Sequence, residues 1–323
     1  MLRLHTYVQK YSTITSKPKY FHILLIFPTI LRRGITPVRS FIWFVRSGNR
    51  NDRFNYTKNA PKIDLVWVSE RKDFKFLPFS IEYALKYTAN EIESITVVVP
   101  DFQIEECRHL IKKLKIQNRT HILAENQVIP PEIRASIKER FPSKYGWILQ
   151  QFIKLQLVLN SKSKGVLLID SDTMMLEEAL WLDDNLVSLF RLAEWKHPPY
   201  FKFLKEIGLN INKPKFSFVT HHMIMQPPIL SEAILNLGHN NLIDFFKFVL
   251  SKLNNENIGG LSIDFEFYGN YFFLRYPEKI KMTKFCNLSL NSNVKDSSIK
   301  NLISRVERKN DYRSLSLHSW NSF

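Results

Sequence analysis

Two aspartates, Asp170 and Asp172, follow directly on an apolar run at 165–169 and are separated by a single serine. The run predicts a buried strand, and ligand sites in open α/β sheets lie beyond the carboxyl ends of the strands. Carboxylates at such an end can project towards one point. Their hard oxygen atoms suit Mg²⁺ or Mn²⁺, which would bridge the oxygens of a diphosphate and neutralise its charge as it departs. The alternative is a solvated turn in which an aspartate caps the next helix.

Lys154 belongs to a predicted helix at 147–160 and follows Gln150 by four residues and Gln151 by three. These spacings place the polar groups on one face of an otherwise apolar helix. With Gln151 beside it, the ammonium group of Lys154 would contact a phosphate as a point charge. The alternative is a surface lysine whose stem packs along apolar side chains.

Strand-like and helix-like segments alternate over the first half of the domain that carries these residues. Short apolar runs predict strands at 63–69, 95–99, 121–123 and 165–169. Helical spacing of apolar residues predicts helices at 79–87, 104–114 and 147–160. This alternation predicts an α/β fold with a mainly parallel sheet that is covered by helices on both faces.

The second half is less regular. The stretch at 217–226 is strand-like, 230–237 and 242–253 look helical, and an aromatic-rich stretch follows at 263–273. We expect this half to bind the second substrate. The predicted domain runs from 61 to 323, because a polar, turn-rich segment ends just before Pro61.

The N-terminal 60 residues form a separate basic and partly apolar extension. The net charge of the chain is +16, and residues 1–51 hold nine Lys or Arg and no Asp or Glu. Basic residues among apolar and aromatic ones suit an anionic membrane surface, with residues 1–50 lying on it. Packing of this extension on the domain is the alternative. Nucleic acid is a disfavoured partner, because no recognition motif accompanies the charge.

Two features bear on the compartment. No apolar run reaches the length of about 20 residues that a membrane-spanning helix needs. Cys107 and Cys286 lie far apart, and neither has a Cys or His partner at zinc spacing. We therefore predict a reducing, cytoplasmic location, with peripheral attachment to the inner face of the membrane.

Six segments in chain order are shared with a known family. They are 64–69 (DLVWVS), 146–155 (GWILQQFIKL), 167–173 (LLIDSDT), 218–223 (FVTHHM), 264–270 (DFEFYGN) and 317–320 (LHSW). In these segments the chain resembles the DUF6492 family, which is similar to GT-A nucleotide-diphospho-sugar transferases. The resemblance implies a GT-A-like fold and a metal-dependent glycosyltransferase. Such an enzyme moves a sugar from a UDP- or GDP-type donor to a hydroxyl group of a glycan or lipid-linked acceptor, in surface glycan or polysaccharide synthesis.

The resemblance also implies roles for particular residues. Asp170 and Asp172 would bind Mn²⁺ or Mg²⁺, and Asp170 would also face the nucleotide sugar. Val68 and Ser69, at the end of the first strand, would hold the nucleoside. His318 would complete the metal site as a late histidine, since a neutral imidazole ligates Mn²⁺ well. The alternative, a histidine on a frayed tail, is disfavoured by its apolar frame of Leu315, Leu317 and Trp320.

His221 and His222 follow a strand-like run, so their side chains should point to opposite faces. One side chain should face the ligand side of the sheet, and the other should pack inside the domain. Three roles are open for the histidine on the ligand side, namely acceptor-sugar binding, orientation of a carboxylate and metal ligation. We favour His222 for this position.

Asp264 and Glu266 stand two apart on a segment predicted to be extended, so they should share a face. An inverting transferase needs a carboxylate that accepts the proton of the attacking hydroxyl. We predict Glu266 for this role, with Asp264 as the second candidate. A clamp that binds donor or acceptor hydroxyls is the alternative.

Two other functions compete with the transferase. A nucleotidyltransferase of similar fold would carry a Gly- and Lys-rich signature near the first strand, and 66–71 does not supply one. A non-catalytic module that binds a nucleotide or glycan would keep the fold. The intact set of Asp170, Asp172, Glu266 and His318 argues against this third interpretation.

Overall fold

The computed structural model describes residues 59–318 apart from 117, 118, 194, 212, 213, 215 and 295. Its central sheet has five strands in the order β3-β2-β1-β4-β7. They are β1 (Ile63–Val68), β2 (Ile92–Val99), β3 (Thr120–Ala124), β4 (Gly165–Asp170) and β7 (His222–Met225). Neighbouring strands are parallel except β7, which is antiparallel to β4. The predicted α/β class with a mainly parallel sheet is confirmed.

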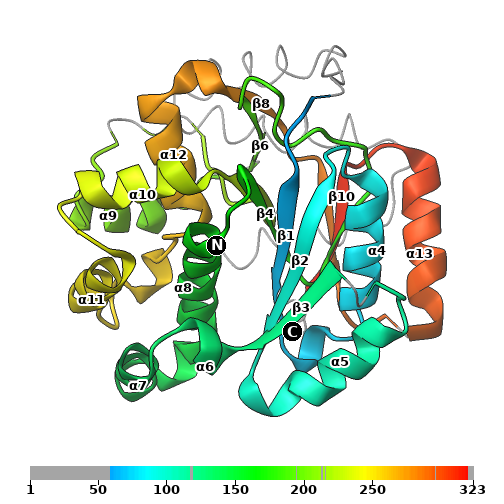
Figure 1. Ribbon diagram of the computed structural model, residues 1–323, viewed down its shortest axis with the longest axis horizontal. Coiled ribbons are helices and arrows are strands. Elements are labelled where there is room, and N and C mark those ends of the chain that lie inside the picture. The colour runs from blue at the N-terminus through cyan, green and yellow to red at the C-terminus, as the bar shows by residue number, and fades with distance from the viewer. Residues whose placement is uncertain are drawn as a thin grey trace, which may run out of the picture. The chain divides into compact units, whose positions relative to one another are not determined.

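Helices cover both faces of this sheet. Helix α8 (Tyr145–Asn160) packs against β1 and β4, and α4 (Leu77–Tyr87) lies on the opposite side (Figure 1). The indole Nε1 of Trp67 in β1 donates a 2.9 Å hydrogen bond to the hydroxyl of Ser80 in α4. Because both faces are covered, β1 is apolar from Leu65 to Val68 and β4 from Val166 to Ile169, without alternation of polar residues.

The order of the strands reverses between β1 and β4. The chain proceeds outward from β1 to β2 and β3, and then crosses back to place β4 on the other side of β1. Val68 and Asp170 are register partners at the carboxyl ends of these two strands. This is the topological switch point at which open α/β sheets bind their ligands.

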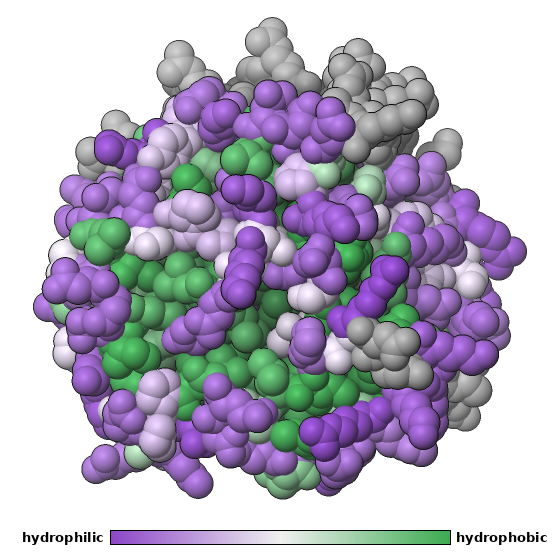
Figure 2. All heavy atoms as spheres, in the orientation of Figure 1, coloured by the Kyte–Doolittle hydropathy of each residue, from purple (hydrophilic) through white to green (hydrophobic). Residues whose placement is uncertain are grey.

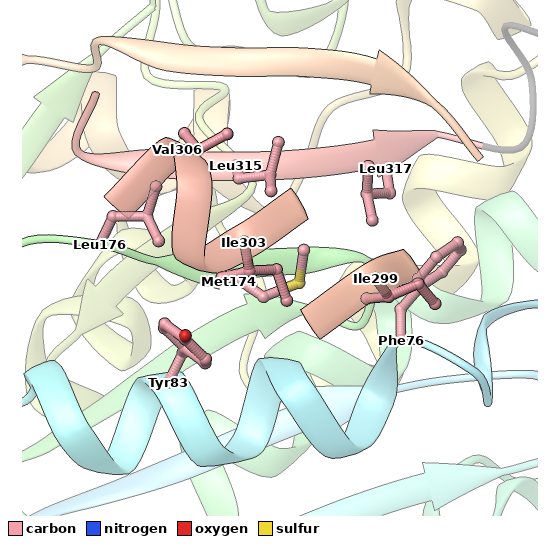
Figure 3. Packing of buried hydrophobic residues seen from close by; sticks show 9 residues of the cluster. All are labelled: Phe76, Tyr83, Met174, Leu176, Ile299, Ile303, Val306, Leu315 and Leu317. Atoms are coloured by element: carbon pink, nitrogen blue, oxygen red, sulfur yellow. The ribbon is translucent and has the colours of Figure 1, made fainter. Parts of the chain in front are cut away.

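Residues 287–318 return to the carboxyl ends of β1 and β4 through a smaller sheet. This sheet has the order β5-β10-β9 and consists of β5 (Thr173–Met175), β10 (Ser314–His318) and β9 (Asn287–Asn291). Strand β10 is antiparallel to β5, which directly follows the acidic turn. Figure 3 shows the apolar core that joins this sheet to α4 and α13 (Asp296–Lys309). Its members are Phe76, Tyr83, Met174, Leu176, Ile299, Ile303, Val306, Leu315 and Leu317.

The other elements frame the sheet. The α-helices are α5 (Ile104–Lys112), α6 (Glu125–Val128), α7 (Pro131–Arg140), α9 (Pro198–Glu206), α10 (Pro227–Asn236), α11 (Leu242–Lys252) and α12 (Phe265–Arg275). Short 3₁₀ turns are η1 (Arg71–Asp73), η2 (Asp101–Gln103), η4 (Pro142–Lys144), η5 (Ile258–Gly260) and η6 (Pro277–Lys279). Strands β6 (Ser188–Leu192) and β8 (Ile280–Lys284) pair in parallel. The predicted helices are confirmed to within a few residues.

Two local predictions are wrong, and one alternative is excluded. Residues 264–266 are not extended, because α12 begins at Phe265 with Asp264 as its N-cap. The strand in 217–226 covers only His222–Met225, because the preceding residues form an irregular segment. Asp172 does not cap a helix, since strand β5 follows it.

The surface on the face drawn in Figure 2 shows patches of apolar side chains among polar ones. Within the described part of the chain, no helix is both long and apolar enough to cross a membrane. Cys107 is a buried free cysteine. The predicted extension at 1–60 lies outside the described residues except for 59 and 60, as does Trp320.

Gly269 permits a close approach that matters for the site. A methyl group added at this position of α12 would lie 2.6 Å from Cβ of Phe218 and closer still to its Cγ. Phe218 is buried and packs edge-on against Phe190, so it has little room to retreat. The close contact seats the irregular segment 216–221, which leads to His221, against α12.

We expect Gly269→Ala to lower the free energy of unfolding by about 1–3 kcal/mol, as overpacking a well-filled core does. Gly146→Ala in α8 is the matched control, because a methyl group there meets no atom within 4 Å. The Gly146→Ala change should leave the free energy of unfolding as it is or raise it by up to about 1 kcal/mol. Urea unfolding of both variants measures the difference, and equal effects at the two positions would contradict this account of Gly269.

Candidate active site

The acidic turn at 170–172 is held by two other segments of the chain. Asp170 is the last residue of β4, and its backbone N–H donates to the carbonyl oxygen of His221 at 2.8 Å. The backbone N–H of Leu317 donates to the carbonyl oxygen of Asp172 at 2.9 Å. The turn is therefore fixed on one side by the segment that enters β7 and on the other by β10.

Lys154 lies at the centre of a buried ionic network. Its Nζ atom is 2.9 Å from Oδ1 of Asp170 and 3.2 Å from Oδ2 of Asp264, and only 4% of the residue is exposed. Burial opposes the charge on Lys154, but the two carboxylates outweigh it and raise the pKa of this ammonium group above its usual value. The alternative of a surface lysine is wrong.

Asp170 is held through both of its carboxylate oxygens. Oδ1 accepts from Lys154, and Oδ2 lies 3.1 Å from Nδ1 of His221. Burial would raise the pKa of Asp170, but the charge of Lys154 and the hydrogen bond from His221 hold it well below 3.8. The carboxylate is therefore ionised at neutral pH, and Nδ1 of His221 must be the donor, since an ionised carboxylate only accepts.

His318 comes to Asp172 from the other end of the chain. Nδ1 of His318 lies 3.0 Å from Oδ2 of Asp172, although the two residues are 146 positions apart. His318 is the last residue of β10 and is 2% exposed, so the alternative of a frayed tail is wrong. Its ring centroid is 4.7 Å from that of His221, which places both imidazoles beside the acidic turn.

The fit of a divalent cation is tested by the Asp172–His318 pair. Nδ1 of His318 and Oδ2 of Asp172 are hydrogen-bonded to each other at 3.0 Å, so an ion that both residues held would replace this hydrogen bond. Among the residues that the structure describes, no group of three or more His, Cys, Asp or Glu side chains is arranged to hold a metal ion by itself. Mg²⁺ at phosphate sites takes few protein ligands and completes its shell with phosphate oxygens and water, so two donors fit this mode.

Asp264 and Gln151 lie on the α8–α12 side of the site. Oδ1 of Asp264 accepts from the backbone N–H of Phe265 at 2.8 Å as the N-cap of α12. Oε1 of Gln151 accepts from the backbone N–H of Ile263 at 3.0 Å. Its side chain thus holds the residue before Asp264, whose carboxylate contacts Lys154. A part for Gln151 in binding the nucleotide sugar stays a prediction.

Glu266 is buried away from the acidic turn. Its carboxylate accepts from the hydroxyl of Ser217 at 2.6 Å, the backbone N–H of Phe218 at 3.1 Å and Nδ2 of Asn270 at 2.9 Å. Burial raises the pKa of Glu266 to about 7, although these hydrogen bonds oppose the shift. Two successive helical residues turn Glu266 by about 200° from Asp264, so the two side chains do not share the predicted face.

The adjacent histidines have different surroundings, and His221 rather than the favoured His222 contacts Asp170. His222 begins β7 and is buried edge-on against the ring of Trp181, with centroids 5.1 Å apart. Burial and the charge of Arg191 lower the pKa of His222 to about 3, so it is neutral. His221, which we did not favour, is the one that contacts Asp170. The strand covers only His222–Met225 of the predicted stretch 217–226, and His221 lies just before it with a positive φ angle.

The carboxyl end of β1 contributes two predicted residues and one that the sequence analysis missed. Val68 lies beside Asp170, and the buried hydroxyl of Ser69 has no hydrogen-bond partner among the described residues. Asp73 in η1 accepts from the hydroxyl of Ser171 at 3.4 Å, and burial and the charge of Asp172 raise its pKa to about 7. A carboxylate a few residues beyond the first strand, at the same sheet edge as Asp170, was the signal that could have identified it.

The sequence model of one protein family matches residues 76–243, just over half of the chain. The chain belongs to DUF6492, a family of unknown function. The resemblance inferred from the sequence is thus confirmed. The matched residues include Lys154, the acidic turn and both adjacent histidines, whereas Asp264 and His318 lie outside them. A search of the curated proteins gives no significant match.

Solved glycosyltransferase structures are similar to this DUF6492 chain. Mouse xyloside xylosyltransferase 1, in its apo form, is 8% identical over 81% of this chain and 99% of its own, with a TM-score of 0.44. Galactosyltransferase LgtC, with donor and acceptor sugar analogs, is 11% identical over 79% and 86%, with a TM-score of 0.43. The bifunctional glycosyltransferase WbbM is 13% identical over 84% and 47%, with a TM-score of 0.42. Likenesses this distant do not carry function from one protein to another.

Replacing Lys154 by methionine keeps most of its apolar volume but leaves Asp170 and Asp264 without the ammonium group. Removing one partner of a buried ion pair typically costs about 3–5 kcal/mol. We expect Lys154→Met to lower the free energy of unfolding in urea by an amount near the lower end of this range, because 27% of the Asp170 side chain is exposed. The exposed Lys162, changed to methionine, should alter stability by less than about 0.5 kcal/mol. A loss no larger for Lys154 than for Lys162 would show that the network is not structural.

Proposed function

We propose that this chain is a glycosyltransferase that moves a sugar from a nucleoside diphosphate donor to a hydroxyl group of an acceptor. One observation carries the proposal. The acidic turn with Asp170 and Asp172 meets His318, from a distant part of the sequence, at the topological switch point of a parallel sheet. A buried lysine neutralises Asp170, and the imidazole of His318 is hydrogen-bonded to Asp172.

The site has places for each part of such a donor. Oδ2 of Asp172 and Nδ1 of His318 would hold Mn²⁺ or Mg²⁺, which supplies charge neutralisation to the diphosphate as the sugar–phosphate bond breaks. Val68 and the unpartnered hydroxyl of Ser69 would face the nucleoside at the end of β1. Lys154 is held between two carboxylates and would orient Asp170 rather than bind phosphate directly.

Asp264 is better placed than Glu266 to act on a sugar hydroxyl. Asp264 shares Lys154 with Asp170, so it lies beside the acidic turn, whereas Glu266 is fully buried and bonded to protein donors. We assign Asp264 to contact with donor or acceptor hydroxyls. We assign Glu266 to the support of α12 against the segment at 217–218.

The wider setting is part of the same proposal. A UDP- or GDP-type donor and a glycan or lipid-linked acceptor fit surface polysaccharide synthesis on the cytoplasmic face of a membrane. The basic extension at 1–50 would provide contact with anionic lipids. If residues 1–50 bind anionic lipids, their deletion should release the protein from anionic vesicles.

Calorimetric titration with UDP, GDP and CDP, with and without Mn²⁺, tests the central part. We expect one nucleotide to bind in a Mn²⁺-dependent way, because the phosphate oxygens complete the shell of an ion that has few protein ligands. Asp172→Asn should weaken this binding at least tenfold. Asp184→Asn, at an exposed position outside the site, should leave it unchanged.

Two results would contradict the proposal. If no nucleotide binds with Mn²⁺ or Mg²⁺, the chain is not a metal-dependent transferase of this kind. If a nucleotide binds equally well without metal and in Asp172→Asn, the acidic turn has no part in donor binding. Differential scanning fluorimetry of both variants excludes unfolding as the cause of any loss.

A further inference from the structure

His221 has a backbone conformation that its side chain does not favour. Its φ angle is +60°, in the left-handed region that non-glycine residues seldom occupy. Such a conformation costs free energy and persists where the surrounding structure holds it, often at functional sites. The next residue, His222, begins β7, so the unusual backbone lies exactly one residue before the sheet resumes.

This conformation lets one residue hold Asp170 twice. The carbonyl oxygen of His221 accepts from the backbone N–H of Asp170 at 2.8 Å, and Nδ1 of its ring donates to Oδ2 of the same aspartate at 3.1 Å. In a regular β-strand, side chains point to the two faces of the sheet and not towards the neighbouring strand to which the backbone is hydrogen-bonded. The left-handed backbone is thus tied to the position of the imidazole.

The imidazole of His221 is itself fixed from two sides. Its centroid is 4.7 Å from that of His318 and 5.6 Å from that of Phe285. Lys154 occupies the other oxygen of Asp170 at 2.9 Å. Both oxygens of the Asp170 carboxylate are therefore bonded, one by an ammonium group and the other by a packed imidazole.

A fixed Asp170 has a consequence for its neighbour in the turn. The adjacent carboxylate of Asp172 contacts a different histidine, His318, whose ring packs on that of His221. The contact between the two rings thus links the position of Asp170 to the Asp172–His318 pair, which would hold the cation. Groups that orient the ligands of a metal site commonly control its affinity without touching the ion.

We propose that His221 is a positioning residue of the cation and diphosphate site, which holds Asp170 through its left-handed backbone and its imidazole together. The proposal rests on the proposed function, because it assigns a role within that same site. It differs from ligation, because it assigns His221 to holding Asp170, whereas Asp172 and His318 would hold the ion.

The test is titration of the full-length protein with Mn²⁺ and with whichever of UDP, GDP or CDP the wild type binds. His221→Gly accepts the left-handed backbone freely but lacks the imidazole. Leu186→Gly is the matched control, because Leu186 also has a positive φ of 58° and its side chain is absent from the site. His221→Asn, which tolerates the same backbone, carries the test if the glycine variant does not fold.

We expect His221→Gly and His221→Asn to bind Mn²⁺ at least tenfold more weakly than the wild type, the range seen when partners of metal ligands are removed. Leu186→Gly should bind as the wild type does. Thermal unfolding in the absence of Mn²⁺ should show folded variants, which separates a loss of positioning from a loss of structure.

The outcomes distinguish the two proposals. If the wild type binds no Mn²⁺ and no nucleotide, both the proposed function and the role of His221 are overturned. If the wild type binds and the His221 variants bind equally well, only the role of His221 is overturned. It is also overturned if both His221 variants fail to fold without Mn²⁺, because the residue would then serve folding.

Discussion

A buried ammonium group organises this protein. Lys154 sits in the middle of an apolar helix, and a charge in such a place requires charged or polar partners to offset the loss of water. Two aspartates supply them. One ends β4 and the other caps α12, so the same ion network that neutralises Lys154 joins the central sheet to the C-terminal helices. The position of the acidic turn, and of everything that contacts it, depends on this link.

Two later segments complete the arrangement from opposite sides. The antiparallel pairing of β10 with β5 brings His318 to Asp172, and the core shared by α4, α13 and β10 keeps that strand in place. On the other side, Gly269 lets Phe218 approach α12, and the segment that follows delivers His221 to Asp170. Each aspartate of the turn is therefore matched with one histidine, and the two rings pack on each other.

Much of the central sheet and its helices was predictable from the sequence, because strands that are buried on both faces are rich in apolar residues. The apolar strands, the helix of Lys154 and the aspartates at the end of β4 follow from runs and spacings of side chains. The helix start at 264 was not predicted, since it lies in an aromatic-rich stretch and the contacts of Asp264 with Lys154 and of Ile263 with Gln151 join residues more than 100 positions apart. The choice between His221 and His222 depends on one residue with a positive φ. The protein-bonded environment of Glu266 depends on Ser217, 49 positions away.

The most direct measurement is a crystal structure with Mn²⁺ and the nucleoside diphosphate that binds, with anomalous data collected to locate manganese. The account predicts an anomalous peak within coordination distance of Oδ2 of Asp172 and Nδ1 of His318, with phosphate oxygens in the same shell. Lys154 and His221 should still hold Asp170 in that structure. A peak elsewhere on the protein, or nucleotide bound away from the carboxyl ends of β1 and β4, would contradict it.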